Sequence, residues 1–455
     1  MKSITIVGTG ISGLSAAHFI RKKFPDCTVY LIESNHRVGG NFNTENSDGF
    51  LFEFGPRGVL KSSHAFFHLL ESANLWHLLI PGKKTSSRRY VWYNNQLEQL
   101  GGNPFKVFSS PLMKGVISAV WKERNLTNQK QTDDESLQDF FERRFGKHIT
   151  HNLLDAFITG VWAGDISKLS AKATFPNLVD GEAKHHSVVR GFFKMKKERR
   201  LLSEKETTVF SHPVLPKSRF FSVQGGLQQL AEKLAEPFQS TLFLNHSVTH
   251  LEKPNNEWKI TLNDHHVISS EHILFATPSY VTGKILRSLD HELADALTKI
   301  EYVPVAVVNL GYNKLPSGSE GFGFLVPNNQ QKKILGIIFN SGTFDHVAPN
   351  GGKNFTVMLG GARHQEVFAQ TEDDLMDLAL EAMKEHLDIH QKPDVIRTKK
   401  WIHAIPQYNV GYQDLLDKIT SAQKRHQNLH FAGNWKGGIG INDCVKSSYY
   451  LINNE

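Results

Sequence analysis

A glycine-rich segment near the start of the chain has the residue types that dinucleotide binding requires. Gly8-Thr9-Gly10-Ile11-Ser12-Gly13 follows an apolar run, 4–7, and precedes a stretch of helical periodicity, 14–23. Glycines there permit a tight turn, close approach of backbone to a pyrophosphate and close packing of helix on strand, and the helix N-terminus attracts anions. Glu33 ends a second apolar run, where its carboxylate can accept hydrogen bonds from ribose hydroxyls. We expect cofactor contacts at Gly8, Gly10, Ile11, Ser12, Gly13 and Glu33.

This fingerprint alone does not separate NAD from FAD, because both contain adenosine diphosphate. The residues that follow favour FAD. Glu33 continues into Arg37 and the pair Gly39-Gly40, which resembles the E-x-x-x-R-x-G-G extension of flavoproteins in the amine oxidase superfamily. We expect Arg37 to approach the pyrophosphate, and the glycine pair to let backbone pass beneath the ribityl chain.

A second short segment, Gly55-Pro56-Arg57-Gly58, has the composition of a fixed loop around a positive charge. The two glycines permit unusual backbone angles and Pro56 stiffens the turn. Arg57 can stabilise an anionic reduced flavin through its guanidinium. The alternative is that Arg57 only anchors the loop to a carboxylate.

The elements that position these residues fall into three groups. Residues 4–33 read as strand, turn, helix and strand; between about 85 and 205 longer helical patterns dominate, including one that Thr132 can cap with Glu135. Residues 224–226 open another helix, and strands at 303–310, 334–339 and 355–359 with a helix at 372–387 predict an antiparallel sheet.

These patterns predict an α/β protein in which a Rossmann-like, discontinuous FAD-binding domain is joined by an α+β substrate domain and an inserted helical domain. We place the FAD-binding domain at 1–85, 206–277 and 404–455, the helical insert at 86–205, and the substrate-binding domain at 278–403.

Segments along nearly the whole chain resemble the protoporphyrinogen oxidases, a family of FAD-dependent enzymes of haem biosynthesis. The resemblance rests on Gly55–Gly58 and on the segments 134–136, 161–176, 305–310, 321–327, 356–361, 405–408 and 431–439. It implies noncovalent FAD and oxidation of protoporphyrinogen IX to protoporphyrin IX with O2 as acceptor. It also implies cofactor contacts at Val248, Ala432, Gly437, Gly438 and Ile439, and substrate contacts at Phe322, Gly323, Leu325 and Met358.

Two positions depart from the family pattern. Asn41 follows the glycine pair where relatives often carry an aromatic residue or Arg, and only Lys106 stands near the place where some relatives have an Arg for a substrate propionate. Alternative functions are oxidation of coproporphyrinogen III to coproporphyrin III, another flavin amine oxidase or desaturase, and a non-catalytic FAD-binding scaffold. No residue is assigned as catalytic, since the flavin itself does the redox step.

The composition is that of an ordinary globular protein, with 40% hydrophobic and 21% charged residues among 455. The net charge of +7 is spread without a nucleic-acid motif, so we expect no nucleic-acid partner. His64 and His68 lack further ligands, so we expect no metal site. Two distant cysteines, and a start that leaves no room for a signal peptide, favour a cytoplasmic location.

Two segments, 105–122 and 191–197, mix large apolar side chains with Lys and contain no acidic residue. That composition suits peripheral binding to an anionic membrane surface, on the inner face of the cell membrane; the alternative is that these residues pack the core of the insert. A downstream haem-pathway enzyme and a second copy of the chain are further candidate partners.

Overall fold

The first strand of the chain forms the centre of a parallel sheet, as the sequence predicts. The structure, a computed structural model, describes residues 1–100, 104–126, 134–195, 210, 212–315 and 319–453. Five parallel strands lie in the order β10-β2-β1-β14-β20. Their bounds are Leu242–Phe243 (β10), Thr28–Ile32 (β2), Ser3–Val7 (β1), His272–Phe275 (β14) and Leu429–Phe431 (β20). Because the strands come from three distant parts of the chain, this Rossmann-like unit is discontinuous.

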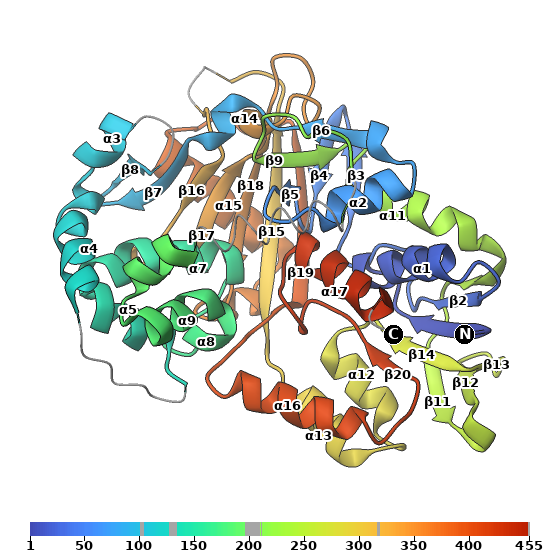
Figure 1. Cartoon of the computed structure of the whole chain (residues 1–455). Helices are drawn as coiled ribbons and strands as arrows, with labels where there is room; N and C mark the ends of the chain where they lie inside the picture. Colours follow the sequence, from blue (N-terminus) through green and yellow to red (C-terminus); the bar gives the residue numbers. More distant parts are fainter. Residues whose placement is uncertain (101–103, 127–133, 196–209, 211, 316–318, 454–455) are drawn as a thin grey trace.

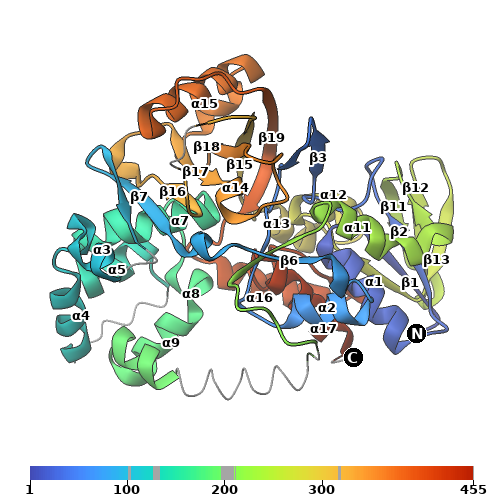
Figure 2. The ribbon, with the colours of Figure 1, turned by 90° about the horizontal axis from the view of Figure 1, so that it is seen from above.

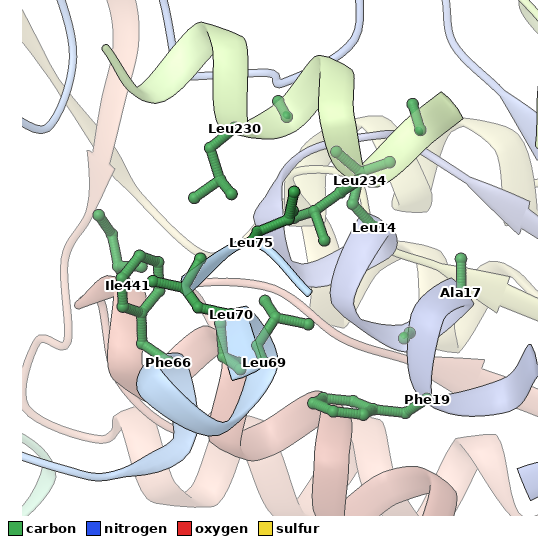
Figure 3. Close-up of a cluster of buried hydrophobic side chains, with 14 of the residues drawn as sticks. Leu14, Ala17, Phe19, Phe66, Leu69, Leu70, Leu75, Leu230, Leu234 and Ile441 are labelled. Atoms are coloured by element: carbon green, nitrogen blue, oxygen red, sulfur yellow. The ribbon is translucent and has the colours of Figure 1, made fainter. Parts of the chain in front are cut away.

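The core of this unit forms where four helices meet, and Figure 3 shows part of it. The helices are α1 (Ile11–Lys23), α2 (Ala65–Ser72), α11 (Leu227–Ala235) and α17 (Ile441–Asn453). Leu14, Leu70 and Leu230 are fully buried there. Each buried side chain of this size contributes roughly 1.5–3 kcal/mol to the free energy of unfolding. Helix α11 begins directly after Gly226, as predicted.

A seven-stranded sheet carries three of the predicted substrate residues, Gly323, Leu325 and Met358. Its strand order is β19-β15-β18-β17-β16-β7-β8. The bounds are Val395–Pro406 (β19), Tyr302–Tyr312 (β15), Lys353–Gly360 (β18), Ile334–Phe339 (β17), Gly323–Leu325 (β16), Arg89–Tyr93 (β7) and Gln96–Gln99 (β8). Helix α15 (Glu372–Leu387), which begins at a capping box of Thr371 and Asp374, covers one face of the sheet. The predicted strands near 303–310, 334–339 and 355–359 and the predicted helix at 372–387 are confirmed.

Strands β7 and β8 belong to this sheet, although residues 86–205 were predicted as a helical insert. Strand β7 pairs in parallel with β16, and β8 pairs with β7 as a hairpin. Asn94 and Asn95 both have positive φ, 49° and 59°, as a tight hairpin turn requires. Within residues 86–205 the helices of the structure therefore begin only at α3. The division of the chain into domains otherwise stays a prediction.

The helices that follow gather on the side of the molecule away from α1 and β2, as Figures 1 and 2 show. They are α3 (Pro104–Ser109), α4 (Val116–Asn125), α5 (Leu137–Phe145), α6 (Lys147–Ile149), a π-helix (Thr150–Leu154), α7 (Asp155–Trp162), α8 (Ala171–Thr174) and α9 (Pro176–His185). Ser136 caps α5 by accepting a hydrogen bond from Asp139 N at 3.1 Å. The prediction that Thr132 caps this helix is therefore wrong. Thr132 itself lies outside the described residues.

Smaller elements connect these layers. Two hairpin strands, β3 (Thr44–Ser47) and β4 (Phe50–Glu53), lead from the first glycine loops toward the segment 55–58. The remaining elements are β5 (Val59–Leu60), β6 (Leu79–Pro81), β9 (Phe220–Val223), β11 (Val248–Glu252), β12 (Trp258–Leu262), β13 (Val267–Ser270), α12 (Ser279–Leu286), α13 (His291–Thr298), α14 (Asn340–Thr343), α16 (Tyr412–Gln423) and short 3-10 turns. In the described part of the chain, none of the helices has the length and apolar character needed to cross a membrane.

Candidate flavin and substrate site

The fold requires glycine at two positions of the first loop, and at the third position it leaves open space. Gly8 has φ of +99°, and a Cβ on Gly13 would lie 2.0 Å from Gly8 O, so both are required by backbone geometry and by packing of α1 on β1. Gly10 has φ of −67°, and a Cβ there would meet nothing within 4 Å. The fold itself therefore does not require glycine at this position, and the space in front of Gly10 is open, as the close approach of a pyrophosphate requires.

The N-terminus of helix α1 faces this space without a competing anion. No side chain caps α1, and its first turn contains no acidic residue. Ile11 and Ser12 are its first residues, so their backbone N–H groups and the positive end of the helix dipole are available to a phosphate. The helix is held in place from α17, since Ser448 Oγ donates to Ser12 O at 2.9 Å.

Glu33 stands at the end of β2 beside the glycine turn, as predicted. Its Oε2 accepts hydrogen bonds from Thr9 N at 3.1 Å and Thr9 Oγ1 at 2.7 Å, and its Oε1 accepts from Asn35 N at 3.0 Å. These bonds fix the buried carboxylate next to the loop. Val248 is close in the fold, because His246 N donates to Glu33 O at 2.9 Å shortly before β11 begins.

Arg37 braces the glycine pair from behind. Its guanidinium donates to Phe42 O at 2.6 Å, to Gln228 Oε1 at 2.7 Å and to Gly40 O at 3.0 Å. Gly39 N in turn donates to Thr9 O at 2.9 Å, and a Cβ on Gly40 would lie 3.2 Å from Gly10 Cα. Arg37 thus positions the second loop against the first, and its predicted contact with pyrophosphate stays a prediction.

Arg57 is the most unusual cation of the site. Its Nε and Nη2 atoms are buried and have no hydrogen-bond partner in the described chain, and no carboxylate forms an ion pair with it there. Burial lowers its pKa to about 10, although nearby Glu53 opposes that shift. A buried guanidinium with free donors requires an acceptor, which an anionic ligand supplies.

The loop around Arg57 permits no alternative side chains at its glycines. A Cβ on Gly55 would lie 1.9 Å from Asn41 O, and one on Gly58 would lie 2.4 Å from Phe221 O. Pro56 lies between them. The loop therefore runs tightly between the segment after the glycine pair and strand β9, with Arg57 fixed in between.

Glu53, at the end of β4, fixes this loop from the other side. Its Oε1 accepts from Leu227 N at the start of α11 at 2.8 Å, and its Oε2 accepts from Thr44 Oγ1 at 2.8 Å. Burial raises its pKa to about 7, despite these hydrogen bonds and the charge of Arg57. The sequence analysis did not identify Glu53 as a residue that fixes the site, because only the fold brings α11 close to it.

The C-terminal return is held by two tyrosines. Tyr408 Oη donates to Asn434 O at 2.7 Å and accepts from Gly438 N at 3.1 Å, and Tyr412 Oη donates to Trp435 O. Their rings stack with centroids 4.3 Å apart. This clamp fixes the segment that contains the remaining predicted cofactor residues, Ala432, Gly437, Gly438 and Ile439. The sequence analysis did not identify Tyr412 as a residue that supports the site. Its spacing from Tyr408 across the start of a helix could have indicated this role.

Two of the predicted substrate residues, Leu325 and Met358, lie in one row across the large sheet. Leu325 pairs with Gly336 and Gly336 with Met358, so the three occupy one row across β16, β17 and β18. Gly336, which the sequence did not single out, leaves the middle of this row without a side chain. Arg57 Nη1 lies 3.8 Å from Met358 Sδ. The loop with the free guanidinium therefore touches the row.

The other three substrate candidates have distinct surroundings. Gly323 is required by the sheet, since its φ is +132° and a Cβ would lie 2.2 Å from Ile337 O. Phe322 packs edge-on against Phe220 with centroids 5.2 Å apart. Lys106 lies in α3, but its side chain is outside what the structure describes.

Other potential chemistry is limited. In the described ranges, no group of three or more His, Cys, Asp or Glu is arranged to hold a metal ion. His64 lies against His212 with the ring nitrogens 2.5 Å apart, in a ring stack with Trp76 rather than with His68 as a ligand pair. Cys27 and Cys444 are both free thiols.

Comparison with known proteins agrees with this geometry. The family model for flavin containing amine oxidoreductases matches residues 11–450. The chain belongs to this family. It is therefore an FAD-dependent oxidoreductase, and the open space at Gly10, the uncapped α1 and the free donors of Arg57 fit FAD.

Relatives match over nearly the whole chain. The chain is 28% identical to coproporphyrinogen III oxidase of Bacillus subtilis, over 98% of this chain and 96% of the relative. It is 30% identical to chloroplastic protoporphyrinogen oxidase 1 of Arabidopsis thaliana, over 98% and 86%. A crystal structure from Exiguobacterium sp. 255-15 has the same fold, with a TM-score of 0.83 at 21% identity over 100% of this chain and 98% of that one.

Replacing Gly10 by Val is expected to abolish FAD retention while the fold persists, because its Cβ meets no protein atom and would occupy the pyrophosphate space. The measurement is FAD released into the supernatant by acid precipitation, per mole of purified protein. Parent protein is expected to release all its flavin, showing noncovalent binding. Glu33→Ala is expected to lose less than Gly10→Val. Full flavin occupancy in Gly10→Val would show that the phosphate loop is assigned wrongly.

Glu53→Gln is expected to change how stability depends on pH. Between pH 4.5, the ordinary pKa of this carboxyl, and about pH 7, Glu53 is protonated in the folded protein and ionised in the unfolded chain. The free energy of unfolding therefore falls as pH rises through this window. The variant is expected to lack this contribution, roughly 1–3 kcal/mol.

Melts of parent holoprotein and Glu53→Gln between pH 4.5 and 8 measure the effect, with Glu381→Gln at an exposed position of α15 as control. A constant stability difference between parent and Glu53→Gln across the range contradicts the raised pKa.

Proposed function

We propose that this FAD-dependent oxidoreductase converts protoporphyrinogen IX to protoporphyrin IX, with O2 as electron acceptor. The observation that carries the proposal is the contact of Arg57 with Met358, which joins the loop with free cationic donors to the apolar row of the large sheet. The full-length similarity to an Arabidopsis protoporphyrinogen oxidase supports the same substrate class.

FAD bound at this site would supply a two-electron acceptor for hydride from a methylene bridge. Three such oxidations, each matched by one O2 reduced to hydrogen peroxide, would remove the six hydrogens that separate protoporphyrinogen IX from protoporphyrin IX. We propose the cofactor contacts that the sequence predicts, from Gly8–Gly13, Glu33 and the Gly39-Gly40 loop to Val248 and the return segment 432–439. Arg57 contributes a fixed positive charge that stabilises negative charge on the cofactor.

The sheet contributes orientation. The row Leu325, Gly336 and Met358 presents two apolar side chains around a position without one, which suits a flat macrocycle. Helix α7 packs directly against the Leu325 end of this row, since a Cβ on Gly160 would lie 2.5 Å from Leu325 Cδ2. Such walls exclude water from the reacting carbon and hold it in one orientation.

A second candidate substrate is coproporphyrinogen III, which carries four propionates. The similarity to the Bacillus subtilis coproporphyrinogen III oxidase, which extends over 98% of this chain, favours it. Both substrates require the same hydride chemistry, so the choice depends on how many carboxylates the site neutralises.

Oxygen consumption and porphyrin fluorescence with each porphyrinogen test the proposal. We expect turnover of protoporphyrinogen IX, and a lower rate with coproporphyrinogen III, because the walls around Met358 and Phe322 are mostly apolar. A marked preference for coproporphyrinogen III shifts the assignment to that substrate. Activity with neither, in FAD-loaded protein, overturns the proposed function in favour of another flavin oxidase or of a scaffold.

We also propose a cytoplasmic location with peripheral attachment to the inner face of the cell membrane, through the helical part. Large apolar side chains are exposed there: Phe105 (86%), Ile117 (69%), Trp121 (67%), Phe192 (45%) and Phe193 (65%). Lys114 and Lys122 flank the α4 group. Exposed aromatic and basic residues together suit an anionic interface. A downstream haem-pathway enzyme and a second copy of the chain remain proposed partners.

Replacing Ile117 and Trp121 by Ser is expected to reduce co-sedimentation with anionic liposomes several-fold, because each large apolar side chain adds favourable transfer energy. High salt is expected to release the parent protein, since Lys contributes through screened charge. Ile402→Ser, which changes an equally exposed residue on β19, is the control. Equal recovery of parent protein in the supernatant with and without anionic lipid contradicts this attachment.

A further inference from the structure

A lysine continues the row of residues that crosses the large sheet. Met358 pairs with Val307 on β15, and Val307 pairs with Lys399 on β19. Because residues directly opposite each other on neighbouring strands project to the same face, Lys399 lies on the same face as Met358. Arg57 contacts Met358 on that face. Lys399 therefore stands two strands away from the position where the Arg57 loop touches the sheet.

The ammonium group of Lys399 packs on an aromatic ring that leads to the same loop. Its Nζ lies 4.9 Å from the centre of the Trp401 ring, which is two positions along the same face of β19. Trp401 Nε1 donates to Phe54 O at 2.8 Å. Phe54 directly precedes Gly55, where the Arg57 loop begins. One indole ring thus separates the ammonium group from the backbone that enters this loop.

The side chains on either side of Lys399 on this face have hydrogen-bond acceptors. Arg397 Nε donates to Glu45 Oε1 at 2.6 Å, and Arg397 Nη2 donates to Ser47 Oγ at 2.7 Å, both on β3. Trp401 binds the end of β4. Lys399 lies between these contacts, but across the described ranges its Nζ forms no ion pair and no hydrogen bond. Its positive charge is therefore available to a ligand between the sheet and the glycine loops.

The surroundings of Lys399 disfavour a lone positive charge. Its side chain is partly buried, and burial, followed by the charge of Arg37, lowers the pKa of Lys399. The two loops that meet nearby bring no charge at their point of contact, where a Cβ on Gly55 would lie 1.9 Å from Asn41 O. A nearby anion would favour the charged form of Lys399 and offset both effects.

We propose that Lys399 binds the flavin ring and stabilises the negative charge that the ring gains on reduction. The assignment rests on the proposed cofactor contacts and is independent of which porphyrinogen is oxidised. Hydride transfer delivers two electrons and one proton, so the ring becomes anionic unless a second proton follows. A fixed ammonium group on the sheet, together with Arg57 on its loop, favours this charged form over the neutral oxidised form.

The midpoint potential of the bound flavin tests the assignment, because it compares how tightly the protein holds the reduced and the oxidised forms. It is measured anaerobically, by equilibration with redox dyes, in FAD-loaded parent protein and Lys399→Gln. We expect the variant to bind the reduced form about tenfold more weakly relative to the oxidised form, which lowers the two-electron potential by about 30 mV. The Kd of oxidised FAD is expected to stay nearly unchanged.

Lys400→Gln is the matched control, since it removes the same charge from the adjacent position of β19. Side chains alternate along a strand, so Lys400 lies on the opposite face, where its Nζ donates to Gln370 O. Its potential is expected to match that of the parent. Lys399→Arg, which keeps the charge, is expected to recover most of the lost potential.

Sulfite binding gives a second readout that requires no porphyrinogen. Sulfite adds to flavin N5 and leaves a negative charge on the ring, and the loss of the flavin absorption band gives its Kd. We expect this Kd to rise several-fold in Lys399→Gln and to recover in Lys399→Arg, because only the charged variants stabilise the adduct.

A potential and a sulfite affinity equal to those of the parent in Lys399→Gln overturn the role of Lys399, while the FAD and porphyrinogen assignments stand. Weaker binding of oxidised FAD with an unchanged potential also overturns it, because the lysine then contacts a part of FAD whose charge does not change on reduction. Purified parent protein that neither contains nor binds FAD would overturn the cofactor contacts and the role of Lys399 together.

Discussion

Buried Glu53 connects the three parts of the molecule on which the site depends. Its carboxyl oxygens accept hydrogen bonds from Leu227 N of α11 and from Thr44 Oγ1 of β3, and its backbone carbonyl accepts one from Asn309 Nδ2 of the large sheet. Asn354 adds two bonds from the sheet to Leu51 O and Val347 O. Burial of these polar groups is favourable only when all partners are in place, so the network specifies where β4 ends. The loop with Arg57 begins at that point.

Within the described chain, Arg57 differs from buried Arg144 in having no carboxylate partner. In the helical part, buried Arg144 forms ion pairs with Glu123 and Glu182. Arg57 has no such partner in the part of the chain that the structure describes, and α1 has no cap. Arg57 contacts the apolar row through Met358, and the uncapped end of α1 lies at the first glycine loop. A cofactor with phosphates and a redox-active ring would supply acceptors to both groups.

Elements with local signals were predictable from sequence. Helix α15 has the predicted bounds, and β2 lies at the second apolar run, because a capping box and a continuous apolar run encode these elements within a few residues. The glycine turn and Glu33 likewise lie where their spacing indicates. Strands β7 and β8 were missed, since the asparagine hairpin at 94–95 was read within a region dominated by helical periodicity.

Roles that depend on distant contacts could not be predicted. Arg37 binds carbonyl oxygens of its own loop and Gln228, which is 191 positions away in sequence. The importance of Glu53 likewise depends on Leu227, and that of Gly336 on its place between Leu325 and Met358 in strand register. Residue types and their spacing can be read from the sequence, but strand register and tertiary packing decide which side chains meet.

Anaerobic mixing of the FAD-loaded protein with protoporphyrinogen IX tests the central claim most directly, because it separates reduction of the bound flavin from its reaction with O2. The account predicts bleaching of the flavin absorption band in the anaerobic step. Return of the band and the appearance of porphyrin fluorescence are expected only when air is admitted, because formation of the porphyrin takes three two-electron oxidations and one flavin accepts only two electrons. Flavin that stays oxidised in the presence of excess protoporphyrinogen IX, and likewise of coproporphyrinogen III, would contradict it.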